Sequence, residues 1–249
     1  MLRSIVLAAG KGTRLHSAEH DLPKVMHRAC GRPLLEIALE LVDFIPKENT
    51  YIVVGYKKED IISYFGPSYH YVEQKEQHGT GHAVMAVADD FRNFDGDVLV
   101  TFGDMPLYRK ESLKALVEAH RASGADCTVM TAICDDLPSY GRITRDAQGR
   151  FSGIVEAKDC TPEQLAITEL NSGVAIFRSK TLFHVLPLLQ CNNAQHEYYL
   201  TDVPAAMMRE GFRVELFPIR DGDEIRGVNT PEELEIVEKI LQKRANSAT

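Results

Sequence analysis

The sequence predicts an α/β fold: a Rossmann-like, doubly wound, mixed and mostly parallel sheet with a small antiparallel insert. Three observations lead to this prediction. Over the first half of the chain, short β-branched runs alternate with segments of helical period, which is the pattern of repeated strand–helix–strand units. Two of the runs, residues 4–9 and 97–104, are almost continuously apolar, as strands buried on both faces of a parallel sheet are. Residues 137–172 break the alternation and have the pattern of an insert.

The strands are predicted where β-branched and apolar residues cluster between turn-forming residues. They are residues 4–9, 50–56, 97–104, 126–134, 172–179 and 213–219. Parallel strands of one sheet are joined by right-handed crossovers, so the segments between the first three runs are expected to cover the sheet as helices.

The helices are predicted from apolar residues that recur every three or four positions. Residues 33–45 (PLLEIALELVDFI) show this spacing most clearly, and residues 79–91 and 110–120 show it less cleanly. The last helix is predicted from its start, because Thr230 is a suitable N-cap, a proline follows in the first turn, and Glu233 completes a capping box.

The middle of the chain is expected to form a small antiparallel insert, residues 137–172, laid over the edge of the sheet. Within it, residues 141–159 have the pattern of a hairpin whose turn is DAQG at 146–149. No internal repeat, low-complexity tract or linker divides the sequence. We therefore expect one domain over residues 1–229, followed by a C-terminal helix over residues 230–249.

The composition narrows the class of protein. The 249 residues include 28 Lys and Arg against 36 Asp and Glu, for a formal net charge of −8. Nucleic-acid binding needs a basic face, so this balance disfavours it, and a phosphate ligand would need cations gathered locally with help from a metal ion. The five cysteines include no C-x-x-C pair, no apolar stretch approaches ~20 residues, and the N-terminus lacks a signal-peptide pattern. We expect a cytoplasmic protein with reduced thiols and no membrane partner.

The first predicted strand ends in a glycine-rich turn, IVLAAGKGTRL at residues 5–15. This turn lies at the carboxyl edge of the sheet, where open α/β folds bind ligands, and its glycines let the backbone approach a phosphate. It is not a P-loop, because G-x-x-x-x-G-K-[ST] is absent. It is also not a full dinucleotide fingerprint, because Leu15 stands where the third glycine belongs and the second strand has no acid at its tip. Taken alone, the turn also fits a simple tight connection.

A second candidate is the segment QHGTGHAV, in which Gly79, Thr80 and Gly81 begin a predicted helix. The free N–H groups there favour anionic or carbonyl ligands, although Thr80 as an ordinary N-cap explains the pattern without a ligand. His78 and His82 have an i, i+4 spacing that can bind zinc. Because no third ligand is near them in the sequence, we favour a histidine packed beside the site.

A third candidate is Asp104, in TFGDMPL at the end of a buried run. A carboxylate at the tip of a buried strand is costly unless it is paired or bound to a metal. An aspartate that only ends the strand in a turn is the alternative at this position.

Several motifs, in order along nearly the whole chain, resemble the sugar-nucleotidyltransferase family. They are LAAGKGTRL…DLPKVMHRACGRPLLE, VEQKEQHGTGHAV, TFGDMPL, SYGRI, IVEAKD, ELNSGV, EYYLTD and GVN. The set is most similar to the branch that makes UDP-N-acetylglucosamine in bacteria, where the uridyltransferase (pyrophosphorylase) is the N-terminal half of a bifunctional uridyltransferase/acetyltransferase. The resemblance implies the nucleotide-diphospho-sugar transferase type of fold.

The resemblance also implies a role for each matching residue. The cations that hold the transferring phosphates, and are therefore catalytic, would be Arg14 and Lys24. The nucleotide would be bound by Leu7, Ala8, Ala9, Gly10, Gln74, Gly79 and Thr80. The sugar would be bound by Phe102, Gly103, Gly141, Glu156, Asn171, Tyr198 and Thr201. The metal, Mg²⁺, would be bound by Asp104 and Asn229; a carboxylate and a carboxamide leave room for phosphate oxygens and water, as Mg²⁺ prefers.

The reaction implied is attack of N-acetylglucosamine 1-phosphate on the α-phosphorus of UTP, giving UDP-N-acetylglucosamine and pyrophosphate. The attacking phosphate oxygen is already ionised, so positioning and charge neutralisation suffice. Another sugar 1-phosphate, another pyrimidine nucleotide, or a non-catalytic nucleotide-sugar-binding protein are the alternatives.

The sequence departs from the family pattern in two places. The connection between Arg14 and Lys24 is a few residues longer than usual, and no hexapeptide repeats of a left-handed β-helix follow the last helix. Acetyltransferase activity is therefore not expected, and the oligomeric state is left open.

Overall fold

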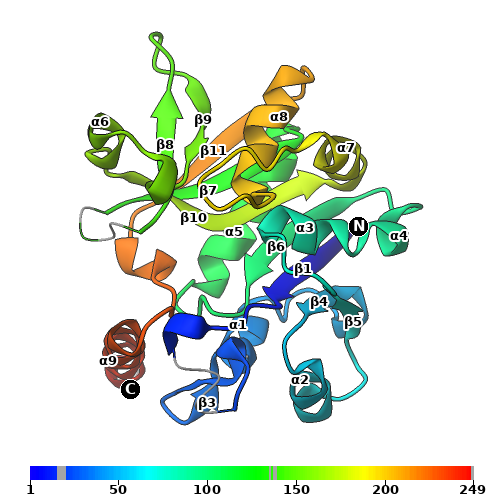
Figure 1. Ribbon diagram of the computed structural model, residues 1–249, viewed down its shortest axis with the longest axis vertical. Coiled ribbons are helices and arrows are strands. Elements are labelled where there is room, and N and C mark those ends of the chain that lie inside the picture. Colours follow the sequence, from blue (N-terminus) through cyan, green and yellow to red (C-terminus); the bar gives the residue numbers. More distant parts are fainter. Residues whose placement is uncertain (16–20, 135, 137–138, 248–249) are drawn as a thin grey trace.

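The computed structural model describes residues 1–15, 21–134, 136 and 139–247, and over these residues it forms a mixed sheet between two layers of helices (Figure 1). The strand order is β11-β7-β10-β6-β1-β4-β5, with the hairpin β8–β9 attached to β10. The strands of this sheet are β1 (Leu2–Ala8), β4 (Thr50–Val54), β5 (His70–Glu73), β6 (Asp97–Phe102), β7 (Cys127–Ile133), β8 (Arg142–Arg145), β9 (Phe151–Val155), β10 (Glu169–Arg178) and β11 (Val214–Ile219). A separate short pair joins β2 (Arg28–Ala29) to β3 (Arg32–Pro33).

Along the seven-strand order, four of the six neighbouring pairs are parallel. Strand β1 pairs in parallel with β4 and β6, β4 with β5, and β7 with β11. Strand β10 runs antiparallel to both β6 and β7, in the middle of the sheet. The prediction of a mixed, mostly parallel, doubly wound sheet is confirmed.

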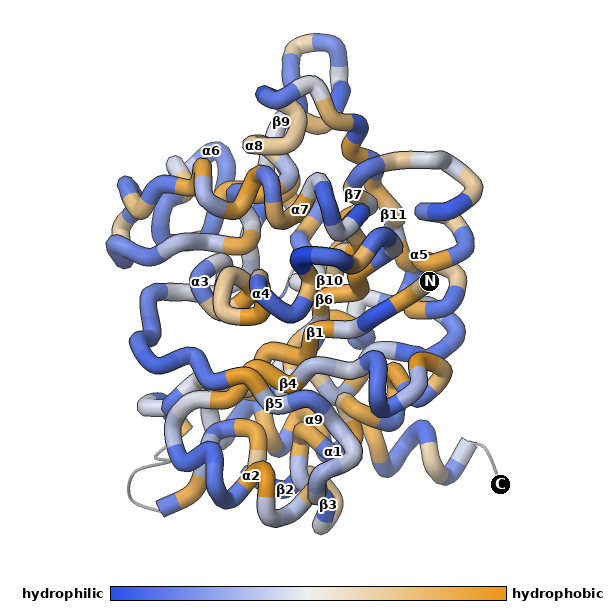
Figure 2. The backbone as a smooth tube through the Cα atoms, turned by 90° about the vertical axis from the view of Figure 1, so that its right-hand side faces the viewer, coloured by the Kyte–Doolittle hydropathy of each residue, from blue (hydrophilic) through white to orange (hydrophobic). Residues whose placement is uncertain are grey.

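The apolar run of β1 is continuous because helices cover both faces of the sheet. Ile5 and Leu7 face one hydrophobic cluster, and Val6 and Ala8 face the other. The first cluster is covered by α3 (Thr80–Met85), α4 (Ala88–Phe91), α7 (Ser179–Val185) and α8 (Val203–Arg209). The second is covered by α1 (Leu34–Leu41), α2 (Lys58–Phe65) and α5 (Lys110–Ser123). Figure 2 shows the apolar strands as a band between these layers.

The predicted helices differ from the observed ones mainly in their ends. Residues 33–45 form the shorter α1, and residues 110–120 form the longer α5, which stops where Gly124 caps it. Residues 79–91 form two helices, α3 and α4, instead of one. Among the described residues, no helix combines the length and the apolar character needed to cross a membrane.

The antiparallel hairpin is confirmed, but it does not lie over an edge of the sheet. Strand β6 pairs with β10 at Ala175–Arg178 only. Strand β8 pairs with β10 at Leu170, beyond the end of β6. The ladder between β10 and β7 shifts register between Asn171 and Ala175. The hairpin therefore continues the sheet past the carboxyl end of β6, where it forms one wall of a cavity. Residues 137 and 138, at the start of the predicted insert, lie outside the described residues, as do residues 16–20 of the longer connection.

The C-terminal helix α9 (Pro231–Ser247) packs against β2 and α1. The predicted capping box is present: Glu233 N–H donates to Thr230 Oγ1 at 3.3 Å, and Thr230 N–H donates to Glu233 Oε2 at 3.2 Å. Val237 is fully buried in a third cluster with Leu34 and Val228. The helix thus covers the segment that leads to Asn229. A short helix, α6 (Pro162–Leu165), completes the α-helices of the described chain.

Candidate functional site

Two cavities open side by side at the carboxyl ends of β1 and β6. One has a volume of about 340 Å³ and lies against the hairpin β8–β9 and β10; the other, of about 380 Å³, lies against the end of β1 and the start of α3. The residues common to both linings are Thr80, Phe102, Asp104 and Asn229. Strands β4 and β6 lie on opposite sides of β1, so the site is at the point where the strand order reverses, the usual ligand position in open α/β sheets.

The cavity at the end of β1 is lined by every residue for which nucleotide binding was predicted. These residues are Leu7, Ala8, Ala9, Gly10, Gln74, Gly79 and Thr80. Lys24 lines the same cavity. Gln77, which the sequence did not single out, also lines it and donates from Nε2 to the carbonyl oxygen of Ala9 at 2.6 Å.

The start of α3 is built around a glycine that no other residue can replace without strain. Gly79 has φ = +101°, and a Cβ atom there would lie 2.6 Å from the carbonyl oxygen of Tyr198. Gln74, only 6% exposed, donates from Nε2 to the carbonyl oxygen of Gly79 at 3.0 Å and lies 3.2 Å from Nδ1 of His82. The carboxamide of Gln74 is therefore held beside Gly79 and Thr80 in the cavity wall.

The two predicted metal ligands come together although they lie far apart in the chain. The Nζ atom of Lys24 donates both to Oδ2 of Asp104 and, at 2.9 Å, to Oδ1 of Asn229. Arg14 Nη2 donates to the same Asn229 oxygen at 3.3 Å. A carboxylate oxygen and a carboxamide oxygen thus converge on one cation.

The backbone holds Asn229 at this point. Val228 N–H donates to the carbonyl oxygen of Asp104 at 3.0 Å, and Asn229 N–H donates to Glu233 Oε2 at 2.6 Å. The end of β6 and the first turn of α9 therefore fix the spacing between Asp104 and Asn229.

These residues fit a divalent metal ion. The ammonium of Lys24 already occupies the position between the two oxygens, which shows that their arrangement accommodates a positive charge. Two oxygen ligands from the protein, with the rest from substrate and water, is the usual pattern for Mg²⁺. No group of three or more His, Cys, Asp or Glu side chains placed for a metal occurs in the described part of the chain, so a site made wholly of protein ligands is not found there.

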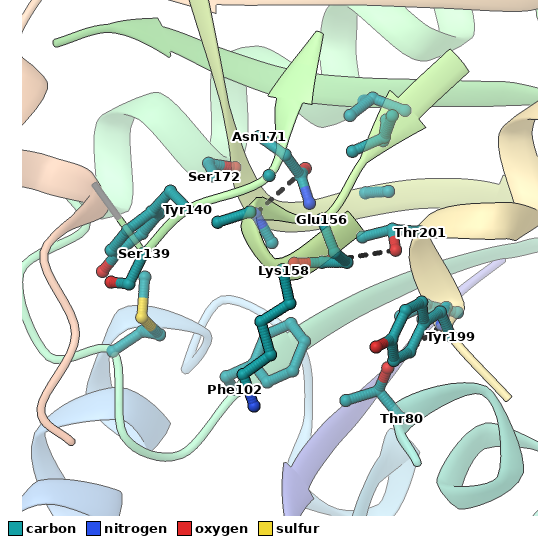
Figure 3. Close-up of a pocket in the computed structure, with 18 of the residues that line it drawn as sticks. Thr80, Phe102, Ser139, Tyr140, Glu156, Lys158, Asn171, Ser172, Tyr199 and Thr201 are labelled. Atoms are coloured by element: carbon teal, nitrogen blue, oxygen red, sulfur yellow. Dashed lines mark hydrogen bonds between the residues drawn. The ribbon is translucent and has the colours of Figure 1, made fainter. Parts of the chain in front are cut away.

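The cavity beside the hairpin contains most of the residues for which sugar binding was predicted (Figure 3). Phe102, Gly141, Glu156, Asn171 and Thr201 line it. It forms at the irregularity of β10, where Asn171 N–H donates to the carbonyl oxygen of Gly141 at 2.9 Å and Asn171 Oδ1 accepts from Gly173 N–H at 3.1 Å. The register shift between β10 and β7 thus lies at the point where the cavity opens.

Glu156 is a carboxyl group with a shifted pKa on this wall. Burial raises its pKa above the usual range, the hydrogen bond from Thr201 Oγ1 to Oε1 at 2.9 Å opposes the rise, and the charges of Asp202 and Asp159 add to it. A carboxylate in this state is stabilised by further donors, such as sugar hydroxyl groups.

The inner part of the same cavity is apolar. It is lined by Val129, Ile154, Ala175, Phe177, Leu200 and Pro204. These side chains can pack against an apolar group of a ligand.

Two predicted sugar residues do not line either cavity. Gly103 faces inward, where a Cβ atom would lie 2.9 Å from Leu35. The carbonyl oxygen of Tyr198 accepts a hydrogen bond from Gly81 N–H at 2.7 Å. The side chain of Tyr198 packs against the first hydrophobic cluster. The next residue, Tyr199, lines the cavity beside the hairpin. The sugar-binding role of Tyr198 stays a prediction. The doubled tyrosine of EYYLTD gave no way to choose between them.

Other lining residues were missed by the sequence analysis. They are Ser139, Tyr140, Lys158 and Gln195, and Figure 3 shows Lys158 reaching across the cavity toward Phe102. Lys158 Nζ donates to Gln195 Oε1, which joins the end of the hairpin to the segment before Tyr199. Ser139, Tyr140 and Lys158 lie within the motifs SYGRI and IVEAKD, but the resemblance assigned the contacts to their neighbours Gly141 and Glu156. Gln195 lies in none of the motifs.

The histidine pair flanks the start of α3. His78 Nε2 lies 2.8 Å from Glu76 Oε2, and the rings of His78 and His82 are 5.2 Å apart. His82 contacts Gln74 in the wall of the cavity at the end of β1, so it packs beside the candidate site.

Comparison with known proteins agrees with the motifs. The chain is 42% identical over 246 residues to the bifunctional protein GlmU of Synechococcus sp. (strain CC9605), covering 98% of this chain and 53% of that protein. It is 42% identical over 243 residues to the bifunctional protein GlmU of Lactococcus lactis subsp. lactis (strain IL1403), covering 98% and 52%. The chain thus spans about half the length of the curated relatives it matches. The similarity to part of a bacterial bifunctional protein, which the motifs indicated, is confirmed.

Comparison with solved structures also agrees with the predicted fold. A solved structure of UDP-glucose pyrophosphorylase complexed with UDP-glucose superposes with a TM-score of 0.77 at 18% identity, covering 98% of this chain and 100% of that one. The predicted type of fold is confirmed. Residues 4–140 match the MobA-like NTP transferase domain, which is more than half of the sequence. The chain belongs to the MobA-like NTP transferase domain family.

Proposed function

We propose that this chain transfers UMP from UTP to N-acetylglucosamine 1-phosphate, with Mg²⁺, in the cytoplasm, giving UDP-N-acetylglucosamine and pyrophosphate. The observation that carries the proposal is that two adjoining cavities share Asp104 and Asn229. A nucleotide in one cavity and a sugar phosphate in the other would bring their phosphates together at these two residues. The likeness to GlmU proteins over 98% of the chain supports the same activity.

The nucleotide would lie along the end of β1 and the start of α3. Gln74 presents a carboxamide, which can donate and accept hydrogen bonds as a uracil edge requires. The backbone of residues 7–10 and the cations of Arg14 and Lys24 would contact the phosphates. Arg14 and Lys24 both bind Asn229, so each cation is already near the point where the reacting phosphates would meet.

The residues Asp104 and Asn229 would hold Mg²⁺ through one oxygen each. Mg²⁺ bound there would offset the negative charge of the phosphate groups. The chain's part in the reaction is to align the attacking phosphate oxygen with the α-phosphorus and to keep Arg14 and Lys24 near the phosphate charge. The attacking oxygen is ionised at neutral pH, so no side chain has to remove a proton.

The sugar would occupy the cavity beside the hairpin. Glu156 and Asn171 offer polar groups for the hydroxyl and amide groups, and the apolar inner part fits the methyl group of an acetamido substituent. This arrangement favours an N-acetylated hexosamine over glucose within the same chemistry.

We further propose that residues 1–229 carry the nucleotidyltransferase activity and that the helix over residues 230–249 supports them. Both cavities are lined by residues up to Asn229.

The test is an assay of pyrophosphate release with UTP, Mg²⁺ and a panel of sugar 1-phosphates. We expect release with N-acetylglucosamine 1-phosphate at a kcat/KM well above that for glucose 1-phosphate or galactose 1-phosphate. Equal rates would overturn the sugar assignment, and a preference for another pyrimidine triphosphate would overturn the choice of UTP. Nucleotide-sugar binding with no pyrophosphate release would support a non-catalytic binding protein instead.

A further inference from the structure

The loop that forms one wall of the sugar-side cavity also contacts the segment that carries Asn229. Tyr140 lines that cavity, and Figure 3 shows its ring on the wall opposite Tyr199. Its hydroxyl oxygen accepts a hydrogen bond from Gly227 N–H at 2.7 Å. Tyr140 therefore joins the cavity wall to the backbone two residues before Asn229.

Three consecutive N–H groups fix the segment from Gly227 to Asn229. Gly227 donates to Tyr140, Val228 to the carbonyl oxygen of Asp104 at 3.0 Å, and Asn229 to a carboxylate oxygen of α9 at 2.6 Å. The second and third partners belong to the end of β6 and to α9. The first is the one that connects this segment to the sugar-side cavity.

The segment is closely packed on the side of Met105, so it can shift only away from that side chain. Gly227 is buried, and a Cβ atom on it would lie 2.2 Å from the sulfur of Met105. If the hydroxyl of Tyr140 were removed, the buried N–H of Gly227 would lose its acceptor, which costs more than an exposed hydrogen bond does. The backbone would then move, and Asn229 would move with it.

Tyr140 is itself fixed by groups of the sugar-side cavity. The next residue, Gly141, accepts from Asn171 N–H at 2.9 Å, and a Cβ atom on Gly141 would lie 3.6 Å from the carboxyl group of Glu156. On the other side, Arg226 Nη2 donates to Asp136 Oδ2 at 2.5 Å, a second link between this loop and the segment of Asn229. Burial raises the pKa of Tyr140, so the oxygen that accepts from Gly227 belongs to a neutral hydroxyl group.

From these contacts we infer that Tyr140 is a positioning residue: it holds Asn229 in place for the metal ion and ties that placement to the wall of the sugar-side cavity. The inference rests on the proposed function, because Asn229 is taken as a metal ligand. It assigns to Tyr140 an effect on metal affinity, exerted through Gly227 and not through direct contact with the metal.

The test measures metal binding without turnover. Mn²⁺, a paramagnetic substitute for Mg²⁺, is titrated into the protein saturated with UDP-N-acetylglucosamine, and free Mn²⁺ is followed by electron paramagnetic resonance. We expect Tyr140→Phe to weaken Mn²⁺ binding by about fivefold to thirtyfold, the range for losing one partly buried hydrogen bond. The matched control is Tyr71→Phe, which removes a similar hydroxyl bond, to the carbonyl oxygen of Gly66 at 2.7 Å, near the far edge of the sheet. It should leave Mn²⁺ affinity unchanged.

A double-mutant cycle separates positioning from a general loss of structure. In an Asn229→Ala background, Tyr140→Phe should cause no further loss of Mn²⁺ affinity, because the ligand that it positions is gone. Unchanged Mn²⁺ affinity in Tyr140→Phe, or an equal loss in the Asn229→Ala background, would overturn the positioning role alone. Failure of the unsubstituted protein to bind Mn²⁺ with the nucleotide sugar would overturn the metal assignment of the proposed function, and this inference with it.

Discussion

Replacing Lys24 should have two opposite effects: it should lower the stability of the free protein and increase the stabilisation by added Mg²⁺. Its ammonium contacts Asp104 and Asn229, and the side chains of Lys24 and Asp104 are 13% and 18% exposed. Breaking a buried ion pair costs about 3–5 kcal/mol, whereas an exposed pair contributes about 0–1 kcal/mol. This pair lies between those limits, so we expect Lys24→Met to lower the free energy of unfolding by about 2 kcal/mol. For a chain of this size that lowers Tm by about 4–8 °C.

Metal ions should reverse this loss. Because Lys24 occupies the position between the Asp104 and Asn229 oxygens, its removal leaves that position open to a divalent cation. Added Mg²⁺ should therefore raise the Tm of Lys24→Met more than it raises the Tm of the unsubstituted protein. Turnover should still fall by about 10²–10³-fold, since one of the cations near the reacting phosphates is lost.

Both effects can be measured on the same samples, by thermal unfolding with and without Mg²⁺ and by pyrophosphate release. The control is Lys180→Met, which removes a surface ion pair with Asp95 at 2.6 Å and should change stability by less than about 1 kcal/mol. Asp95 precedes the first residue of β6, at the opposite end of that strand from the cavities. If Lys24→Met kept nearly full turnover, or if Mg²⁺ stabilised both proteins equally, the assignment of Lys24 to the phosphate and metal site would be wrong.

Four further outcomes are expected. Arg14→Ala should lose turnover by about 10²-fold or more with little change in Tm, because its side chain is exposed; a variant with near-normal kcat would remove Arg14 from the reaction. Asp104→Asn should shift the Mg²⁺ dependence of the rate to higher concentration, and an unchanged metal titration would contradict its role as a ligand. Glu156→Gln should raise Tm at neutral pH. Burial raises the pKa of Glu156 in the folded state, so the ionised group destabilises the folded protein above that pKa. The gain should vanish as the pH falls below the pKa of an unfolded glutamate, and a gain that persists there would point to another cause. Ala175→Val should fill part of the apolar inner cavity and lower kcat/KM for N-acetylglucosamine 1-phosphate more than for glucose 1-phosphate, which a comparison of the two substrates would reveal.

Much of the fold was predictable because its signals are local. The continuous apolar run of β1 faces helices on both sides, and the capping box of Thr230 and Glu233 marks the start of α9. Strand β5 was not predicted, because its exposed residues at the edge of the sheet leave little apolar pattern. Helices α2, α7 and α8 were also not predicted, since the analysis relied on the few segments with the clearest period.

The candidate site was predictable in part for a different reason. The motifs named residues that the fold brings together over large separations, such as Asp104 and Asn229, but a motif does not say which side chain faces a cavity. Adjacent tyrosines point in different directions, so only coordinates distinguish Tyr198 from Tyr199. The position of the hairpin beyond the end of β6 likewise depends on tertiary pairing, which alternating residues in one segment do not encode.

The bond from Asn229 N–H to Glu233 has a practical consequence for protein engineering. A fragment cut after residue 229 would keep every side chain of both cavities. It would lose the acceptor that orients Asn229, the proposed metal ligand, and the apolar cover that Val237 gives to Val228. We therefore expect the terminal helix to support the proposed activity, and a fusion or truncation that preserves this activity should keep its first two turns intact.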